Sequence, residues 1–594
     1  MAGKHTSVYA LEQNAQVIPG TAVLVQGARV CTYRDLDERA NQVGRALLKL
    51  GVKRAERFTI ALTNCFEFVE STYGAWKLAA ITVPLNYRFM DDELVNVIEN
   101  SDSVGVVLED EFLETFLRIR TRLPKVRFLL VVGETPSNPS ERIYNYDEFV
   151  SEQDTSKPVL AWAEQTDSDV GYNIYTGGTT GMPKGISYNE RALLETIREG
   201  ALGGINKILK TATETDTEKL KELPGGAVLA SGFGQTVLKA SWTSKVLTAL
   251  VRRIPLSYTS LLPKRLSGNA RGLVVSPMMH SVGWGVSHAL PRVGGTVYIL
   301  EDKSFNAKEA IRLLKQNNIA FIAAIGDATL KPILAELDEN PVKLPYLKTI
   351  GAVGMPTSPE VKEGLLKRHL PHAMFVDCIG GSELTGMAVT VYTAKDTQFD
   401  KATFPTTDIV QIINPETGLS VMPGEVGELA RKTNILPNGY YKDPEKTKKL
   451  IREINGDTWI MSGDLARLDE QGNFHFVGRG SECINTGGEK VYPEEVENIV
   501  KLIDGIKMVG ITATPDKKYG ELVTAVVELE PGIELSDEDV INFTKGKISG
   551  YKRPRKVIFT EEFPRTLIGK PHYKALRDLA MQELTKEEHQ AEAS

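Results

Sequence analysis

A glycine- and threonine-rich stretch at residues 175–185 holds the side chains best suited to binding an anion. It reads Tyr-Thr-Gly-Gly-Thr-Thr-Gly-Met-Pro-Lys-Gly. Glycines let backbone N–H groups converge on one point, threonine hydroxyls add hydrogen-bond donors, and Lys184 adds a mobile positive charge. A Walker A loop requires Lys followed by Ser or Thr, whereas Lys184 lies between Pro183 and Gly185. We therefore infer a polyphosphate ligand; the alternative is a flexible turn that binds nothing.

The ordered string is too long for a chance match, and it closely resembles the phosphate loop of the AMP-forming adenylating superfamily. This superfamily includes acyl-CoA synthetases, peptide-synthetase adenylation domains and beetle luciferases. The resemblance implies that ATP binds here, with Thr176 also contacting Mg²⁺ and with Lys184 as a catalytic cation. The residues expected to hold the ATP phosphates are Thr176, Gly177, Gly178, Thr179, Thr180 and Gly181.

A second motif, residues 375–386, resembles the Tyr-Gly-x-Thr-Glu signature of the same superfamily. Glu383 is suited to hold Mg²⁺ beside the phosphates, and Ser382 can donate a hydrogen bond to them. The residues expected around the nucleotide are Gly354, Cys378, Ile379, Gly380, Gly381 and Ser382. Many relatives stack an aromatic ring on adenine where this chain has Ile379, so we expect a flat apolar contact instead.

Two further motifs resemble parts of the superfamily's acid and ribose sites. Residues 276–285 match a motif in which a histidine or aromatic side chain gates the carboxylate site, which makes His280 a catalytic candidate. A histidine satisfied within the core is the alternative, and Trp284 is interpreted either as pocket wall or as core. Asp464 follows a glycine and is a natural bidentate acceptor for two ribose hydroxyls, and Arg479 is expected beside it.

The last motifs lie near the C-terminus. Gly487 and Gly488 would leave room for the pantetheine arm of CoA, and Lys490 could meet a CoA phosphate. Lys570 ends a string that resembles the superfamily's terminal Pro-x-Thr-x-x-Gly-Lys motif, which implies that it is the catalytic lysine. Relatives usually carry Asp or Lys at the interdomain hinge, where this chain has Ser481, so we expect a hinge with different local electrostatics.

The elements that must position these motifs alternate between strand and helix. Thr32 is expected to cap a helix, and a strand at 58–62 and a helix at 66–78 follow. This alternation is typical of doubly wound α/β layers. After the glycine-rich loop we expect residues 187–198 to pass from a loop into a helix, and we expect Asp327 to cap another helix.

The length of 594 residues exceeds one ordinary core, so two or more domains are expected. The resemblance extends from about Thr32 to Lys574 and implies an α/β fold. We expect a large N-terminal domain, residues 1–479, made of layered α/β sheets and a small β subdomain. A small mobile α+β C-terminal domain, residues 480–594, would carry the catalytic lysine.

Composition excludes several classes of protein. Hydrophobic residues make up 42% of the chain and charged residues 25%, as in soluble globular proteins, and the net charge of -7 argues against nucleic acid binding. The four cysteines lack metal-ligand spacing, no signal peptide opens the chain, and no apolar run reaches the length of a membrane span. We expect reduced thiols and a cytoplasmic location.

Residues 223–300 form an unusual segment with eight basic residues and no acidic one. A helix over 237–254 would be basic and amphipathic, so it could contact a membrane surface or a partner. We favour the alternative, in which its apolar side packs into the protein's own core.

Together, the resemblances imply an ATP-dependent acyl-CoA ligase that acts through acyl-AMP. The expected ligands are ATP, Mg²⁺, CoA and a small-molecule carboxylic acid, with a fatty or bulky hydrophobic acid favoured; a homodimer is left open. The alternatives are an acyl-AMP ligase that loads a carrier protein, a luciferase-type oxygenase and a non-catalytic nucleotide-binding relative.

Overall fold

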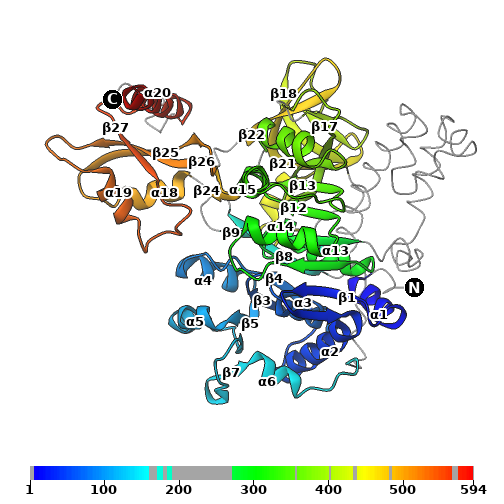
Figure 1. The fold of residues 1–594 in the computed structure, drawn as a ribbon. Helices are drawn as coiled ribbons and strands as arrows, with labels where there is room; N and C mark the ends of the chain where they lie inside the picture. The colour runs from blue at the N-terminus through cyan, green and yellow to red at the C-terminus, as the bar shows by residue number, and fades with distance from the viewer. Residues whose placement is uncertain are drawn as a thin grey trace, which may run out of the picture.

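In a computed structural model, the chain contains two mixed β-sheets with associated helices, an antiparallel sheet and a separate smaller sheet near the C-terminus (Figure 1). The structure describes residues 6–158, 170–177, 183–189, 270–354, 357–399, 403–415, 417–432, 438–479, 484–491, 493–564 and 573–592. The expected helix over 237–254 and most of the basic segment lie outside these ranges. Within the described residues, no helix has the length and apolar character needed to cross a membrane.

The first α/β sheet has the strand order β19-β9-β8-β4-β3-β5-β6-β7. Its strands are β3 (Arg57–Ala61), β4 (Ile81–Pro84), β5 (Ser103–Glu109), β6 (Phe128–Val132), β7 (Ile143–Asn145), β8 (Val170–Gly177), β9 (Pro183–Asn189) and β19 (Gly439–Tyr440). Strands β3 to β8 run parallel, whereas β9 returns antiparallel to β8 and β19 pairs antiparallel with β9. The associated helices are α2 (Tyr33–Lys49), α3 (Phe66–Lys77), α4 (Asp91–Asn100), α5 (Leu113–Ile119) and α6 (Tyr146–Ser151).

The second α/β sheet has the strand order β15-β14-β13-β12-β10-β11-β1-β2. Its strands are β1 (Ala22–Gln26), β2 (Arg29–Thr32), β10 (Arg271–Val274), β11 (Thr296–Ile299), β12 (Phe321–Ala324), β13 (Thr349–Val353), β14 (Met374–Gly381) and β15 (Leu384–Tyr392). The associated helices are α1 (Ser7–Val17), α13 (Ser281–Arg292), α14 (Ala307–Gln316), α15 (Gly326–Glu339) and α16 (Pro359–Glu363). The predicted layered α/β fold is therefore confirmed.

Helices between the two sheets join them into one core. Trp76 of α3 and Trp284 of α13 pack edge to face, with ring centroids 5.8 Å apart. Both side chains are fully buried in an apolar cluster that also contains Ile60 of the first sheet and Val297 of the second. The strands on either side are rich in apolar residues, as expected where this cluster covers the inner faces of both sheets.

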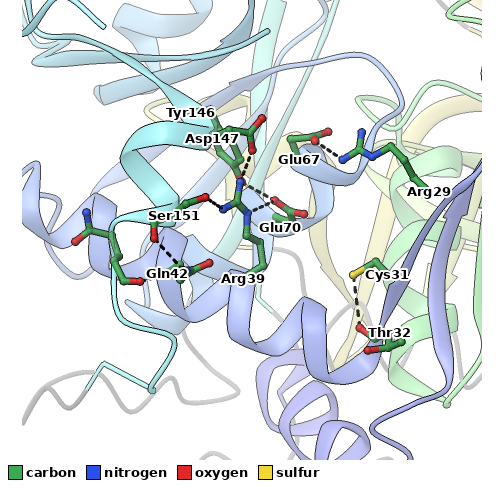
Figure 2. Close-up of polar contacts among 11 residues, drawn as sticks. Arg29, Cys31, Thr32, Arg39, Gln42, Glu67, Glu70, Tyr146, Asp147 and Ser151 are labelled. Carbon is green, nitrogen blue, oxygen red and sulfur yellow. Dashed lines mark hydrogen bonds and ion pairs between the residues drawn. The ribbon is translucent and has the colours of Figure 1, made fainter. Parts of the chain in front are cut away.

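Polar side chains connect the helices α2, α3 and α6 of the first sheet, as Figure 2 shows. Arg39 of α2 donates from Nε to Oε2 of Glu70 in α3 at 3.1 Å. The same guanidinium contacts Asp147 and donates to Oγ of Ser151 in α6 at 2.9 Å. One arginine thus connects three helices, and Tyr146 Oη adds a hydrogen bond to Glu70 Oε2 at 3.0 Å.

Helix-cap predictions had mixed outcomes. Thr32 begins α2 with a capping box, because its hydroxyl accepts from Asp35 N while the Asp35 carboxylate accepts from Thr32 N. The prediction that Asp327 caps a helix is wrong: Ile325 occupies the N-cap position of α15. Asp327 instead accepts a hydrogen bond from Ser358 N at 2.8 Å, so it connects α15 to the start of α16.

The predicted β subdomain is an antiparallel sheet with the main strand order β16-β22-β21-β18-β17. Its strands are β16 (Thr403–Pro405), β17 (Val410–Ile413), β18 (Val426–Lys432), β20 (Ile451–Ile454), β21 (Asp457–Leu468) and β22 (Asn473–Arg479). Helix α17 (Pro444–Leu450) precedes β20, and Asp443 caps it by accepting from Lys446 N at 2.9 Å.

The small C-terminal domain has its own sheet and its own core of buried aliphatic side chains. It lies to one side of the larger N-terminal domain (Figure 1, orange to red). Its strands are β23 (Ile484–Thr486), β24 (Glu489–Val491), β25 (Ile506–Asp516), β26 (Gly520–Leu529) and β27 (Lys556–Phe559), and its helices are α18 (Pro493–Val500), α19 (Asp537–Phe543) and α20 (Tyr573–Glu592). The division into a large N-terminal and a small C-terminal domain is as predicted.

Candidate active site

The glycine-rich motif lies at the turn of the β8–β9 hairpin. Thr176 is paired with Lys184 across the two strands, and residues 178–182 between them lie outside the described ranges. The prediction that 187–198 passes from a loop into a helix is wrong at its start, because residues 187–189 continue β9. The rest of that range lies outside the described residues.

Lys184, the predicted catalytic cation, forms an ion pair. Its Nζ lies 2.8 Å from Oδ2 of Asp443, the cap of α17. The hydrogen bond from Lys184 is the largest cause that holds the pKa of the Asp443 carboxyl below its usual range. The Lys184 side chain remains 32% exposed, so its amine is accessible beside the hairpin turn.

Glu383 lies at the turn of a second hairpin, between β14 and β15, where Gly381 faces Leu384. Tyr440 Oη donates to Glu383 Oε1 at 2.8 Å, and Tyr188 Oη donates to the carbonyl of Ser382. Tyr188 belongs to β9 and Tyr440 to β19, which pair with each other in the first sheet. These two tyrosines therefore connect the second hairpin to the strands that carry the glycine-rich turn.

The predicted Mg²⁺ site has one carboxylate as its main donor. Glu383 is 7% exposed and offers a carboxylate, while the described residues contain no cluster of three metal-ligating side chains. Mg²⁺ is usually held by one or two carboxylates, several waters and substrate phosphates rather than by a protein cage. A single buried carboxylate, hydrogen-bonded to Tyr440 of the strand that pairs with β9, fits this pattern. Thr176, the other predicted ligand, is the second-last residue of β8 in the β8–β9 hairpin.

The predicted purine-binding residues lie at the carboxyl ends of two neighbouring parallel strands. Val353 faces Cys378 in the β13–β14 pair, which puts Gly354 next to the segment from Cys378 to Gly381. Gly354 has φ +87°, and among the described residues other than its chain neighbours no atom lies within 4 Å of the position that a Cβ would take. Ligands commonly bind at this edge of an α/β sheet. Burial raises the pKa of the Cys378 thiol to about 12, so a role as thiolate nucleophile is not supported.

The two predicted ribose contacts are brought together by strand pairing. Asp464 on β21 faces Arg479 on β22, although 15 positions separate them in the sequence. The Asp464 side chain is buried, at 6% exposure. The preceding Gly463 has φ +81° and donates from its backbone to Glu428 Oε1 at 2.8 Å, which fixes the backbone before the carboxylate.

His280 lies directly before α13 and faces the C-terminal domain. Its Nε2 is 3.2 Å from Oε1 of Glu489, which also lies 3.2 Å from Nη1 of Arg88. Burial alone would raise the pKa of the Glu489 carboxyl, but His280 and Arg88 hold it below its usual value. A Cβ on Gly488 would lie 2.6 Å from Cγ2 of Ile325 in the N-terminal domain. The β23–β24 turn with Gly487 and Gly488 therefore reaches the N-terminal domain beside His280.

Trp284 is part of the core. Its side chain is 1% exposed and stacks on His288, with ring centroids 4.5 Å apart. Burial lowers the pKa of the His288 imidazole to about 4, so this ring stays neutral near pH 7. Gly285, one position further along α13, has no side chain of the described part of the chain within 4 Å of a possible Cβ. If α13 contributes to an acid pocket, Gly285 is better placed than Trp284.

Several predicted residues cannot be placed. Those outside the described residues are Gly178, Thr179, Thr180, Gly181, Ser481 and Lys570. Lys490 is described and lies on β24, two positions after Gly488. Sequence reasoning missed the contacts made by Tyr188, Tyr440, Asp443, Arg88 and Glu489. Each depends on pairing between distant segments, and a local pattern does not predict such pairing.

Comparisons with known proteins identify the family of the chain. The AMP-binding enzyme model matches residues 11–217 and 243–441, and the model of the AMP-binding enzyme C-terminal domain matches 495–570. The 3-oxocholest-4-en-26-oate–CoA ligase of Rhodococcus rhodochrous is 30% identical over 576 residues, with 96% of this chain and 94% of that protein covered. The medium/long-chain-fatty-acid–CoA/3-oxocholest-4-en-26-oate–CoA ligase of Mycobacterium tuberculosis is also 30% identical, with 95% and 94% covered.

A solved structure extends the likeness to the fold. The amide bond synthetase of Marinactinospora thermotolerans matches with a TM-score of 0.72 at 18% identity, covering 97% of this chain and 99% of that one. The resemblance inferred from the motifs is therefore confirmed over nearly the whole length. The chain belongs to the AMP-binding enzyme family and, within it, to the adenylate-forming acyl-CoA ligases.

Proposed function

We propose that this protein joins a hydrophobic carboxylic acid to CoA in two steps, with ATP consumed and AMP and pyrophosphate released. In the first step the acid attacks the α-phosphate of ATP and forms acyl-AMP. In the second step the CoA thiolate attacks the acyl carbonyl and AMP leaves. The observation that carries the proposal is the contact of the Gly487–Gly488 turn with the N-terminal domain beside His280.

The first step brings two anions together, so its barrier is largely electrostatic. Lys184 and the backbone of the β8–β9 turn would contribute positive potential at the phosphates, and Tyr440 orients the Glu383 carboxylate. Glu383 and Thr176 would hold Mg²⁺, which neutralises phosphate charge when bound. We further propose that Asp464 and Arg479 hold the ribose, that the segment from Cys378 to Ser382 with Gly354 holds the purine, and that Lys570 supplies the catalytic amine.

The second step needs a path for a long, narrow thiol to the acyl carbonyl. Two consecutive glycines at the β23–β24 turn keep side chains out of the space between this turn and the N-terminal domain, and both have positive φ. Glu489 draws His280 toward the turn. Lys490 on the following strand is proposed to meet a CoA phosphate.

For the acid we propose a fatty acid or a bulky alicyclic acid such as a steroid side-chain acid. Support comes from the names of the relatives, several of which are ligases for medium- and long-chain fatty acids and for 3-oxocholest-4-en-26-oate. We also propose a domain boundary at residues 479/480 and a cytoplasmic location. The described cysteines, Cys31, Cys65 and Cys378, form no disulfide among themselves, and free thiols are typical of a reducing compartment.

The test is incubation of the purified protein with ATP, Mg²⁺ and a panel of acids from acetate to steroid side-chain acids, with and without CoA. We expect AMP and acyl-CoA, with bulky and long-chain acids used best. Accumulation of acyl-AMP that CoA does not discharge would indicate a ligase for a carrier protein. Absence of acid-dependent ATP–pyrophosphate exchange with every acid would contradict the proposal and favour a non-catalytic nucleotide-binding protein.

A further inference from the structure

Three charged side chains meet where the C-terminal domain lies against α4. Lys552 Nζ contacts Oε1 of Glu93 in α4 and lies 2.7 Å from Oε1 of Glu495 in α18. Ser549 Oγ donates to the other oxygen of Glu93 at 2.9 Å. The Lys552 and Glu93 side chains are 2% and 8% exposed. A lysine and a carboxylate from opposite domains therefore form a buried ion pair that none of the family motifs includes.

We propose that Lys552 and Glu93 are positioning residues for thioester formation, because their contact holds the Gly487–Gly488 turn against the N-terminal domain. The proposal rests on the proposed function, since only the second step needs this turn beside His280. The N-terminal segment from Arg88 to Glu93 contacts the C-terminal domain through two of its side chains: Arg88 pairs with Glu489, and Glu93 with Lys552. One short segment thus fixes the C-terminal domain at two points.

In this structure the C-terminal domain is docked with its Gly487–Gly488 turn against the N-terminal domain. The Lys552–Glu93 ion pair is specific to this docked arrangement, because its members belong to different domains. Lys552 and Glu495 both lie in the C-terminal domain, so they can remain paired when the domains separate. Docking of the domains brings Glu93 to the Lys552–Glu495 pair and removes all three side chains from water. This removal costs free energy unless opposite charges compensate one another. Burial raises the pKa of the Glu495 carboxyl to about 7, Lys552 opposes this shift and Glu93 adds to it. The positive charge of Lys552 thus compensates the two carboxylates, Glu93 and Glu495, that docking brings together.

This charge arrangement predicts an unusual pattern of variants. Lys552→Met would leave Glu93 and Glu495 facing each other only in the docked arrangement. We expect thioester formation from supplied acyl-AMP and CoA to slow by roughly tenfold or more, and acid-dependent ATP–pyrophosphate exchange to stay within about twofold. Adding Glu93→Gln removes one of the two carboxylates, so the double variant should form thioester faster than Lys552→Met alone. Glutamine at this position can still accept the cap hydrogen bond from Met90 N, which Glu93 accepts at 3.0 Å.

Asp92→Asn is the matched control. Asp92 lies in the same turn of α4 and pairs at 2.7 Å with Arg122, within the N-terminal domain. Both half-reactions of this variant should match those of the unchanged enzyme. An equal loss of both half-reactions in Lys552→Met, or a double variant slower than Lys552→Met, would overturn the proposal.

Hydrogen–deuterium exchange on the substrate-free protein separates this inference from the proposed function. The backbone N–H of Lys552 donates to the Ser549 carbonyl at 2.9 Å, so the peptide over 549–552 reports on this contact. We expect faster exchange there in Lys552→Met and partial restoration in the double variant. Unchanged hydrogen–deuterium exchange in Lys552→Met would contradict the contact between Lys552 and Glu93 itself. A wild-type enzyme that catalyses ATP–pyrophosphate exchange but makes no acyl-CoA would instead contradict the CoA ligase proposal. This conclusion would hold whatever the hydrogen–deuterium exchange shows.

Discussion

Tyr440 donates a hydrogen bond to the buried Glu383 carboxylate across 2.8 Å, although 57 positions separate the two residues in the chain. The carboxylate leaves its hairpin turn toward the strand pair β9–β19, where Tyr440 lies opposite Ile186. The orientation of the proposed metal-binding carboxylate therefore depends on a pairing between two distant strands. A side chain that orients a ligand in this way affects metal affinity even though it does not bind the metal.

Tyr440→Phe should weaken the first half-reaction. The hydroxyl bonds a charged group, and such bonds contribute about 1.5–3 kcal/mol, so a loss of roughly tenfold or more in acid-dependent ATP–pyrophosphate exchange is expected. The loss should be greater at low than at high Mg²⁺ concentration. Tyr441→Phe is the neighbouring control, because Tyr441 Oη donates to Asp102 at 2.7 Å, and its exchange rate should be unchanged. Equal effects of the two variants would mean that Glu383 is not the group affected.

Lys184→Met should raise the KM for ATP by roughly tenfold with little change in thermal stability. The pair with Asp443 is about one-third exposed, and such pairs contribute only about 0–1 kcal/mol. A loss of ATP affinity without a loss of stability would therefore identify contact with phosphate. Asp443→Asn preserves a good helix cap while removing the carboxylate charge, and it should not raise the KM. A large fall in melting temperature for Lys184→Met would indicate a structural ion pair instead.

The order of elements could be predicted from local patterns, whereas the contacts around the site could not. The strand at 58–62 and the helix at 66–78 were recognisable from their periodicity, and they correspond to β3 and α3. The cap at Thr32 was recognisable because its partner, Asp35, is three residues away. The Asp327 prediction failed because the competing donor, Ser358 N, comes from another segment 31 positions later.

The same reason limits what could be predicted of the site. Motifs identify Glu383 and His280, because each motif is contiguous in the sequence. Their partners Tyr440 and Glu489 come from a strand pairing and from a contact between domains. Such partners are set by the packing of the whole chain rather than by neighbouring residues, so only the structure reveals them.

Glu70 should make the stability of the N-terminal domain depend on pH. Burial raises the pKa of its carboxyl to about 7, although the nearby Arg39 opposes the shift. A carboxyl whose folded-state pKa exceeds its unfolded value binds more protons when folded. Its contribution is therefore fully present below the unfolded pKa of about 4.5 and is lost as the pH rises to about 7. The loss amounts to at most about 3 kcal/mol.

Glu70→Gln keeps a neutral side chain of the same shape and should remove this dependence. The difference in melting temperature, variant minus wild type, should increase from pH 5 to pH 7.5 and then level off. Asp147→Asn is a suitable comparison, because Asp147 contacts the same arginine but is 63% exposed. Parallel pH profiles for wild type and Glu70→Gln would contradict the elevated pKa of Glu70.

Lys570→Ala should separate the two half-reactions in the opposite sense to Lys552→Met. If Lys570 is the catalytic amine of adenylation, its loss removes positive charge from the transition state of the first step, where negative charge builds up on the phosphates. Acid-dependent ATP–pyrophosphate exchange should fall by at least about a hundredfold, and thioester formation from supplied acyl-AMP and CoA should be spared. Opposite effects of Lys570→Ala and Lys552→Met would mean that the C-terminal domain uses different surfaces for the two half-reactions. A general loss of folding would instead reduce the rates of both half-reactions in each variant. Loss of both half-reactions in Lys570→Ala would contradict this division, and the melting temperature would show whether unfolding is the cause.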